Sequence, residues 1–172
     1  MEQVILVDGQ DNETGVMEKL QAHIEGRLHR AISVFIFNSK GELLLQQRAE
    51  GKYHSANLWT NTCCSHPRPG EPVQDAAVRR LFEEMGLRCE LKEVFSFVYK
   101  AQLDHNLTEY EFDHVFVGTC DDLPKPDVTE VAAWMYIKPD TLIKDTGEYP
   151  DKYTAWFSIC LQDWTNELFD LQ

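Results

Sequence analysis

The segment that decides the fold is "SHPRPGEPVQDAAVRRLFEEMGL", residues 65–87. It begins with turn-forming residues, and from Val73 to Met85 an apolar residue recurs at every fourth position. That spacing places the apolar side chains on one face of a helix, and Gly86 stands where a left-handed residue often ends one. The segment therefore predicts a loop, an amphipathic helix that packs on a core, and a second loop.

Runs of β-branched and aromatic residues on both sides of this helix predict strands. They span 4–8, 29–38, 43–48, 93–103, 108–120 and 131–139, with short strand pieces inside the turn-rich segment 51–70. Polar residues predict turns at 9–15, 39–42 and 104–106. Helices are predicted over 139–145, after a proline, and over 153–168, where the apolar spacing is amphipathic. We therefore expect an α+β fold, a mixed β-sheet sandwich flanked by helices.

The chain has 172 residues, enough for one domain with its own core. It contains no internal repeat and no Gly/Ser linker, so we expect a single domain over 1–172. The N-terminal apolar run stops at Asp8 without a basic segment before it, so we expect neither a signal peptide nor a membrane span. The five cysteines are an odd number without a CxxC pair, so we expect reduced thiols in a cytoplasmic protein.

The net charge of the chain limits the classes of partner that it can bind. The formal net charge is −13 at pH 7, which disfavours nucleic acids and anionic membranes. Twelve of the sixteen Lys and Arg residues lie between Lys19 and Lys100, whereas the C-terminal third is acidic. The first two-thirds of the chain can therefore form a local cationic pocket, which leaves a small anionic ligand open as a partner.

Three histidines and two glutamates are of residue types that bind metal ions. His23, His29 and His66 lie near the ends of predicted strands. Glu109 and Glu111 are two positions apart on a predicted strand, so their side chains point to the same face. A lone histidine is more often structural than a ligand, and two such carboxylates can also form a solvated acidic face. Together, these nitrogen and oxygen donors suit Zn²⁺, Mn²⁺ or Mg²⁺ better than a thiolate-binding metal.

Residues 65–87 also match a functional motif. Five residues separate Ser65 from Glu71, and seven more lead to the sequence RRLFEEMGL, residues 79–87. This spacing resembles the Nudix box, a loop–helix–loop that in hydrolases of that superfamily holds divalent metal against a diphosphate. The chain departs from the box where Ser65 replaces its opening Gly and Arg80 replaces the first Glu of its core. Losing that carboxylate weakens the metal cluster that activates water, whereas the planar donors of Arg80 can bind a diphosphate.

The surrounding segments narrow the resemblance. The stretches TNTCCSHP (60–67), YKAQ (99–102) and EYEFDHVF (109–116) are similar to type 1 isopentenyl-diphosphate isomerases. The similarity covers nearly the whole chain, from about residue 19 to residue 164. It implies a Nudix-like fold and an enzyme of isoprenoid biosynthesis. Such an enzyme converts isopentenyl diphosphate to dimethylallyl diphosphate through a tertiary carbocation.

The resemblance assigns catalytic roles to individual residues. Cys64 and Glu111 match the two catalytic positions, and Tyr99 matches the tyrosine that assists the glutamate. Our hypothesis is that Glu111, with Tyr99, donates a proton to the alkene and that Cys64 removes one from the other face. Trp156 matches the tryptophan that faces the reacting carbons. An indole face can stabilise a carbocation by about 2 kcal/mol and also exclude water.

Metal and diphosphate contacts follow from the same resemblance. The residues that match the metal ligands are His23, His29, His66, Glu109 and Glu111. Glu84 matches a box glutamate that holds a second ion, Mg²⁺ carried in with the diphosphate. The residues that match the diphosphate contacts are Lys19, Arg48, Lys52, Ser65 and Arg80. The implied cofactors are Mg²⁺ with the diphosphate, and Mn²⁺, Zn²⁺ or Mg²⁺ at the His/Glu site.

Other conspicuous residues are expected to be structural. The cysteines and tryptophans expected in the core are Cys63, Cys89, Cys120, Cys160, Trp59, Trp134 and Trp164. The histidines expected in loops or at the surface are His54, His105 and His114. Asp113 is expected on a solvated strand face. No sequence signal sets the oligomeric state, so we expect a monomer, with a dimer as the alternative.

Two other functions stay open. The first is a Nudix diphosphate hydrolase, which the box favours but which Arg80 and the pairing of Cys64 with Glu111 oppose. The second is a non-catalytic module that binds metal and diphosphate. Such a module does not need Cys64, Tyr99 and Glu111 all to be present.

Overall fold

The structure is a computed structural model that describes residues 2–169; Met1 and residues 170–172 of the predicted domain lie outside the described residues. The strands of the described chain are β1 (Gln3–Val7), β2 (Glu13–Glu18), β3 (His29–Phe37), β4 (Leu43–Arg48), β5 (Trp59–Thr60), β6 (Cys63–Ser65), β7 (Lys92–Gln102), β8 (Thr108–Thr119) and β9 (Val131–Ile137). Its α-helices are α1 (Lys19–Glu25), α2 (Val73–Met85), α3 (Pro139–Glu148) and α4 (Ala155–Phe169). Two 3-10 turns are η1 (Asp104–Asn106) and η2 (Pro150–Lys152).

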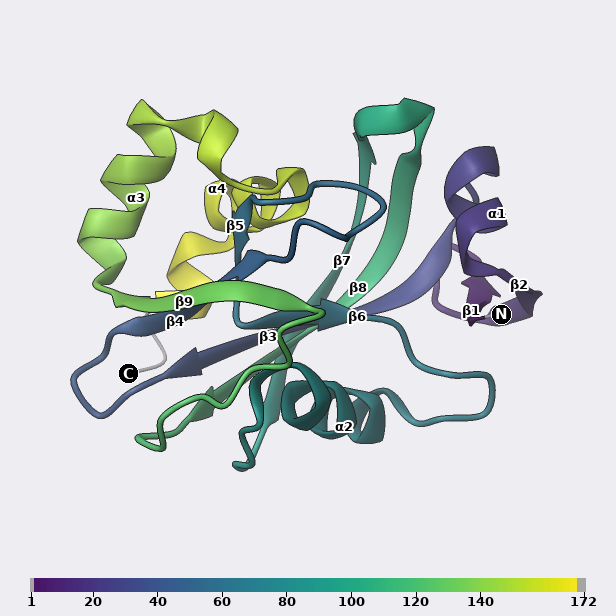
Figure 1. Cartoon of the computed structure of the whole chain (residues 1–172). Coiled ribbons are helices and arrows are strands. Elements are labelled where there is room, and N and C mark those ends of the chain that lie inside the picture. The colour runs from purple at the N-terminus through teal and green to yellow at the C-terminus, as the bar shows by residue number, and fades with distance from the viewer. Residues whose placement is uncertain (1, 170–172) are drawn as a thin grey trace.

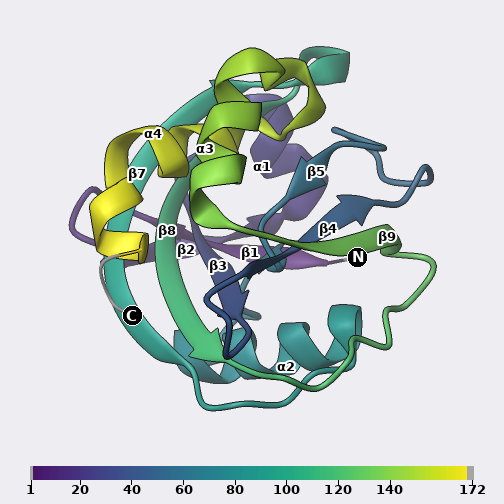
Figure 2. The ribbon, with the colours of Figure 1, turned by 90° about the vertical axis from the view of Figure 1, so that its left-hand side faces the viewer.

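These strands form one mixed sheet with β3 at its centre. β3 pairs in parallel with β8 and antiparallel with β1, β4 and β6. β7 pairs with β8, β9 pairs with β4, and β2 pairs with β1. Figure 2 shows how β7 and β8 curve around the remaining strands. The predicted α+β fold, a mixed sheet flanked by helices, is confirmed.

The core lies in two layers, one on each face of β3. Residues 31–37 of this strand are almost all apolar, as a strand buried on both faces requires. Ile32 and Val34 belong to the cluster that buries the apolar face of α2, whereas Phe35 and Phe37 belong to the cluster that buries α4. Figure 1 shows α2 on one side of the sheet and α3 and α4 on the other. The two amphipathic helices predicted from sequence therefore cover opposite faces.

Most predicted elements are found within a few residues of their expected bounds. The helix predicted over 73–85 is α2, and the helix predicted over 153–168 is α4, which is kinked at Trp164. The turn-rich segment 51–70 contains the short strands β5 and β6. No helix within residues 2–169 combines the length and the apolar character that crossing a membrane requires.

Two elements near the N-terminus differ from the prediction. The segment 9–15 is predicted to be only a turn, but its last residues belong to β2, which pairs with β1. β2 is a polar strand at an edge of the sheet, so its sequence lacks the alternation of apolar and polar residues that marks a half-buried strand. The seven-residue helix α1 follows directly. The carboxylate of Glu18 caps it by accepting from the backbone N–H of Gln21 at 2.8 Å, and Gly26 ends it with a φ of 60°. Because α1 carries Lys19 and His23, this short helix brings two predicted site residues into place.

Candidate active site

The predicted site residues converge at one end of the central strands. His29 on β3 is the register partner of Glu111 on β8, and Tyr99 on β7 is the partner of Glu111 on its other side. A cavity opens there. The predicted residues that line it are Lys19, Arg48, Lys52, Cys64, Ser65, His66, Arg80, Tyr99, Glu109, Glu111 and Trp156.

Four of the predicted metal ligands form one compact group. One donor atom from each of His23, His29, His66 and Glu111 lies within 4.8 Å of the others. The Nδ1 atoms of His23 and His29 each donate to a backbone carbonyl at 2.8 Å, which leaves the lone pair on Nε2. Both Nε2 atoms are buried without a hydrogen-bond partner among the described residues. Imidazole nitrogens held in this way, beside a carboxylate, fit a divalent metal ion.

Glu109, the fifth predicted ligand, lies beside this group rather than in it. Its carboxylate groups with His23 and His54 within the same 4.8 Å limit, and its Oε2 atom is buried with no partner in the described chain. Burial and the charge of Glu111 raise the pKa of Glu109 well above its usual value. Two adjacent buried carboxylates cannot both ionise easily unless a cation lies between them.

The carboxylate of Glu111 contacts three side chains of the site. Its Oε1 lies 2.9 Å from His66 Nε2 and 3.4 Å from His29 Nε2, and its Oε2 accepts from the Tyr99 hydroxyl at 2.6 Å. Burial alone would raise the pKa of Glu111, but the adjacent imidazoles of His29 and His66 hold it well below the usual range. Burial also raises the pKa of Tyr99 far above normal, so its phenol stays protonated and keeps donating to Glu111.

The adjacent cysteines have different surroundings because successive side chains of a strand alternate. On β6, Cys63 is fully buried in the cluster under α2, whereas half-buried Cys64 lines the cavity on the other face. The prediction that Cys63 is a packing residue is confirmed. Burial raises the pKa of Cys64 to about 12, against the opposing charge of Arg48, so Cys64 is a protonated thiol at neutral pH.

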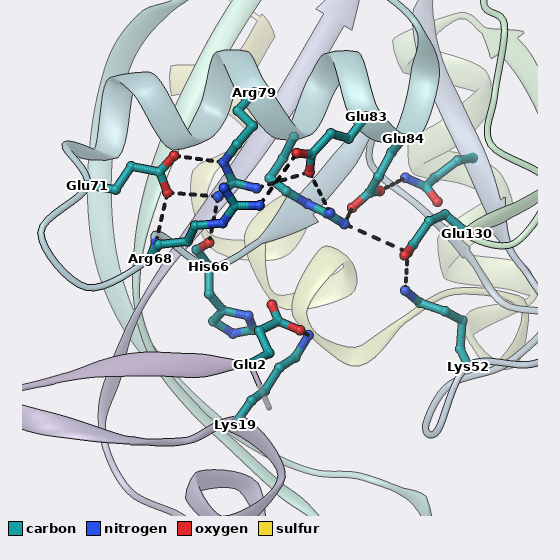
Figure 3. A network of polar contacts seen from close by, with 12 residues as sticks. Glu2, Lys19, Lys52, His66, Arg68, Glu71, Arg79, Glu83, Glu84 and Glu130 are labelled. Carbon is teal, nitrogen blue, oxygen red and sulfur yellow. Dashed lines mark hydrogen bonds and ion pairs between the residues drawn. The ribbon is translucent and has the colours of Figure 1, made fainter.

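Basic side chains cover one wall of the cavity, and most are paired with carboxylates (Figure 3). Lys19 Nζ lies 3.1 Å from Glu2, and Lys52 contacts Glu130. The guanidinium of Arg80 donates to Glu84 at 2.5 Å and also to Glu83. The Nε atoms of Arg48 and Arg80 are buried and have no partner among residues 2–169. These N–H groups can donate hydrogen bonds to an anion in the cavity.

Glu84 differs from the other predicted site residues because it does not line the cavity. It is buried, and its Oε2 accepts from the Gln46 amide at 2.8 Å while Oε1 accepts from Arg80. Arg80 therefore lies against the carboxylate that the resemblance assigns to a second ion.

Three residues expected in loops, at the surface or on a solvated strand face are buried. Asp113 accepts from the Ser33 hydroxyl at 2.7 Å inside the sheet, because it lies on the same inward face of β8 as Glu109 and Glu111. His114 lies between Glu93 and Asp11, at 2.6 and 3.0 Å.

His54 is the third residue of this kind. It lies in a loop but lines the cavity, with its ring edge-on to Trp156 at a centroid distance of 5.9 Å. Its neighbour Tyr53 also lines the cavity and was not predicted. The one sequence signal for both is their place in a long ordered loop, the kind of segment that often carries function. His105 is exposed, as predicted.

Comparison with known proteins decides the family. The NUDIX domain family matches residues 27–157. The Isopentenyl-diphosphate Delta-isomerase of Pectobacterium atrosepticum is 54% identical over 91% of this chain and 88% of its own length. That of Burkholderia multivorans is 51% identical over 94% of this chain and 92% of its own. The chain belongs to the isopentenyl-diphosphate Delta-isomerase family. The resemblance found in the sequence is thus confirmed.

Solved structures show the Nudix fold of this isomerase family member. DR0079 from Deinococcus radiodurans matches with a TM-score of 0.77 at 18% identity and covers 95% of this chain and 99% of its own. A MutT protein from Methanosarcina mazei Go1 matches with a TM-score of 0.67 at 19% identity, over 81% of this chain and 94% of its own. At these identities the likeness concerns the fold, so the isomerase assignment rests on the curated relatives.

Proposed function

We propose that this protein isomerises isopentenyl diphosphate to dimethylallyl diphosphate. The observation that carries the proposal is that Cys64, Tyr99 and Glu111 line the same cavity as four basic side chains. The relatives at 54% and 51% identity are named for this reaction. We also propose a cytoplasmic monomer of one domain that acts on a small diphosphate and binds no nucleic acid. The five free thiols and the net charge of −13 support that setting.

The cationic wall binds the diphosphate. Lys19, Arg48, Lys52 and Arg80 line the cavity together with the hydroxyl-bearing Ser65. The substrate has only a small apolar part, so the diphosphate contacts supply most of the binding free energy. This fixes the alkene against Cys64 and Glu111.

The His/Glu group is proposed to hold Zn²⁺, Mn²⁺ or Mg²⁺, with His23, His29, His66 and Glu111 as ligands and Glu109 beside them. When bound, such an ion supplies positive charge that keeps Glu111 ionised and fixes its orientation. A further Mg²⁺ enters with the diphosphate, and we propose Glu84 as its protein ligand.

The reaction requires one proton to be added to the alkene and another to be removed two bonds away. Cys64 holds a proton and Glu111 is ionised in the resting site, so the pair contains one donor and one acceptor. The Tyr99 hydroxyl donates to Glu111 and so keeps its carboxylate aligned. The order of the two proton transfers stays a prediction: the hypothesis from sequence makes Glu111, with Tyr99, the first donor and Cys64 the base.

Trp156 protects the cationic intermediate. It lies on α4, is almost fully buried, and lines the cavity. The guanidinium carbon of Arg48 lies 5.2 Å from its ring centroid, so this ring already attracts positive charge. Its indole face can stabilise a carbocation and keep out the water that would convert it to an alcohol.

A Nudix hydrolase is the second candidate, favoured by the box and by the structural neighbours. One experiment distinguishes the isomerase from the hydrolase. The protein is incubated with isopentenyl diphosphate and Mg²⁺, and the products are identified by phosphorus and proton NMR. Dimethylallyl diphosphate without released phosphate supports the isomerase. Released phosphate without the isomer supports the hydrolase, and no turnover would leave a binding module.

A further inference from the structure

We propose that Glu130 makes the diphosphate site selective for the Mg²⁺ complex of a diphosphate over the free anion. The inference deepens the proposed function and rests on it. The residue lies directly before β9, and neither the sequence motifs nor the His/Glu group includes it. It lines a second cavity, which shares Lys19, Lys52 and Arg80 with the cavity of the site.

The position of Glu130 is fixed by its backbone. Its carbonyl accepts from the N–H of Ala49 at 3.0 Å, at the end of β4. Its own N–H donates to Asp127, whose N–H donates to the carbonyl of Glu84 at 2.9 Å, near the end of α2. The turn before β9 is thus held between β4 and α2, the two elements that carry Arg48 and Arg80. These contacts fix the backbone of Glu130 beside the elements that carry the two arginines.

The carboxylate of Glu130 faces two of the cations proposed to bind diphosphate. Its Oε2 contacts Lys52 Nζ and lies 3.8 Å from Arg80 Nη2, and its side chain is 28% exposed (Figure 3). Burial opposes ionisation, yet the hydrogen bond and charge of Lys52 and the charge of Arg80 hold the pKa of Glu130 below its usual value. A negative charge therefore lies beside Lys52 and Arg80, two of the side chains proposed to bind the diphosphate.

A fixed carboxylate affects the two forms of the ligand in opposite ways. A free diphosphate must approach Lys52 and Arg80 against the charge of Glu130, and a partly buried site screens that repulsion less than bulk water does. Mg²⁺ removes two negative charges from the ligand. This ion is usually bound by one or two carboxylates together with substrate phosphates, and Glu130 can contact it directly or through a water. The carboxylate thus penalises the free anion and favours the complex.

Titration calorimetry with inorganic diphosphate tests the inference in the full-length protein. The dissociation constant is measured in Mg²⁺-free buffer and at saturating Mg²⁺, and the ratio of the two values is compared among variants. In Glu130→Gln, free diphosphate should bind about tenfold more tightly and the Mg²⁺ complex no more tightly, so the ratio falls about tenfold. Glu83→Gln is the matched control, because Glu83 pairs with the same Arg80 at 2.8 Å but does not line the site. Its ratio should stay at the wild-type value.

An unchanged ratio in Glu130→Gln would overturn the inference. Weaker binding under both conditions would also overturn it, since it would mean that Glu130 only orders Lys52. Thermal unfolding confirms that both variants are folded. If the wild-type protein bound no diphosphate under either condition, the proposed diphosphate site would be wrong too. Normal isomerase activity with an unchanged ratio would contradict this inference alone.

Discussion

At the residue scale, the site is organised around Glu111. His66, which follows β6, and Tyr99 on β7 form hydrogen bonds with its carboxylate, and the His29 ring on β3 lies 3.4 Å from it. The sequence predicted each of these residues through its resemblance to the isomerase family. It could not show that the cross-strand register places Tyr99 opposite Glu111, because register depends on pairing between segments far apart in the chain.

The Tyr99→Phe change tests the contact between Tyr99 and Glu111. It removes the hydroxyl that donates to Glu111 Oε2 at 2.6 Å. A hydrogen bond to a charged group contributes about 1.5–3 kcal/mol, so kcat should fall about 10- to 100-fold with little change in KM. Steady-state isomerase kinetics provide the measurement. Tyr110→Phe, on the opposite face of β8, should keep near wild-type rates, and equal effects of both changes would contradict the assigned role.

At the element scale, α2 and the loop before it follow from local sequence, whereas α1 does not. The four-residue apolar spacing and Gly86 predict both ends of α2. α1 has only seven residues and only two buried side chains, so its hydrophobic pattern is too short to detect. The places of Tyr53 and His54 in the site also could not be predicted from sequence. Their loop has no repeating pattern, and its conformation depends on packing against α1 and α4.

The end of α2 depends on Gly86. Its φ is +67°, and a Cβ there would lie 2.7 Å from the backbone oxygen of Lys125. Gly86→Ala should therefore destabilise the protein by about 1–3 kcal/mol in urea unfolding. Gly147→Ala in α3 is the control, because nothing lies within 4 Å of the added Cβ and helical Ala is favoured over Gly. Similar losses in both variants would show that the close contact at Gly86 has no special cost.

The loop before α2 is held by an ion pair that gives a pH-dependent stability. Both carboxylate oxygens of Glu71 accept from Arg79 at 2.7 Å, and these hydrogen bonds are the main cause that lowers the pKa of Glu71 below 4.5. The unfolded state binds the proton more readily. The stabilisation is therefore complete above about pH 4.5 and is lost as the pH falls through the lowered folded pKa.

Glu71→Gln should therefore cost about 1–2 kcal/mol of unfolding free energy at neutral pH. The difference from the wild type should shrink in acid. Denaturant unfolding at several pH values measures it, with exposed Glu90→Gln as the control. A pH-independent difference would contradict the account.

At the scale of the whole molecule, the resemblance and the residue pattern predicted a mixed sheet with helices on both faces, and the structure has that form (Figure 1). The misplaced residues have one physical cause in common. Asp113 and His114 are polar residues on a strand, and sequence alone does not tell which polar strand positions a neighbouring element covers. The single domain over 1–172 stays a prediction, as do the roles assigned to the site residues.

The central claim is that Cys64 and Glu111 exchange protons with the substrate. Its most direct test is NMR of isopentenyl diphosphate incubated with the protein and Mg²⁺ in D₂O. The wild type should produce deuterated dimethylallyl diphosphate. Cys64→Ala and Glu111→Gln should each slow deuterium incorporation by about 100-fold or more, while both variants still bind inorganic diphosphate. Deuterium incorporation near the wild-type rate in either variant would contradict the account.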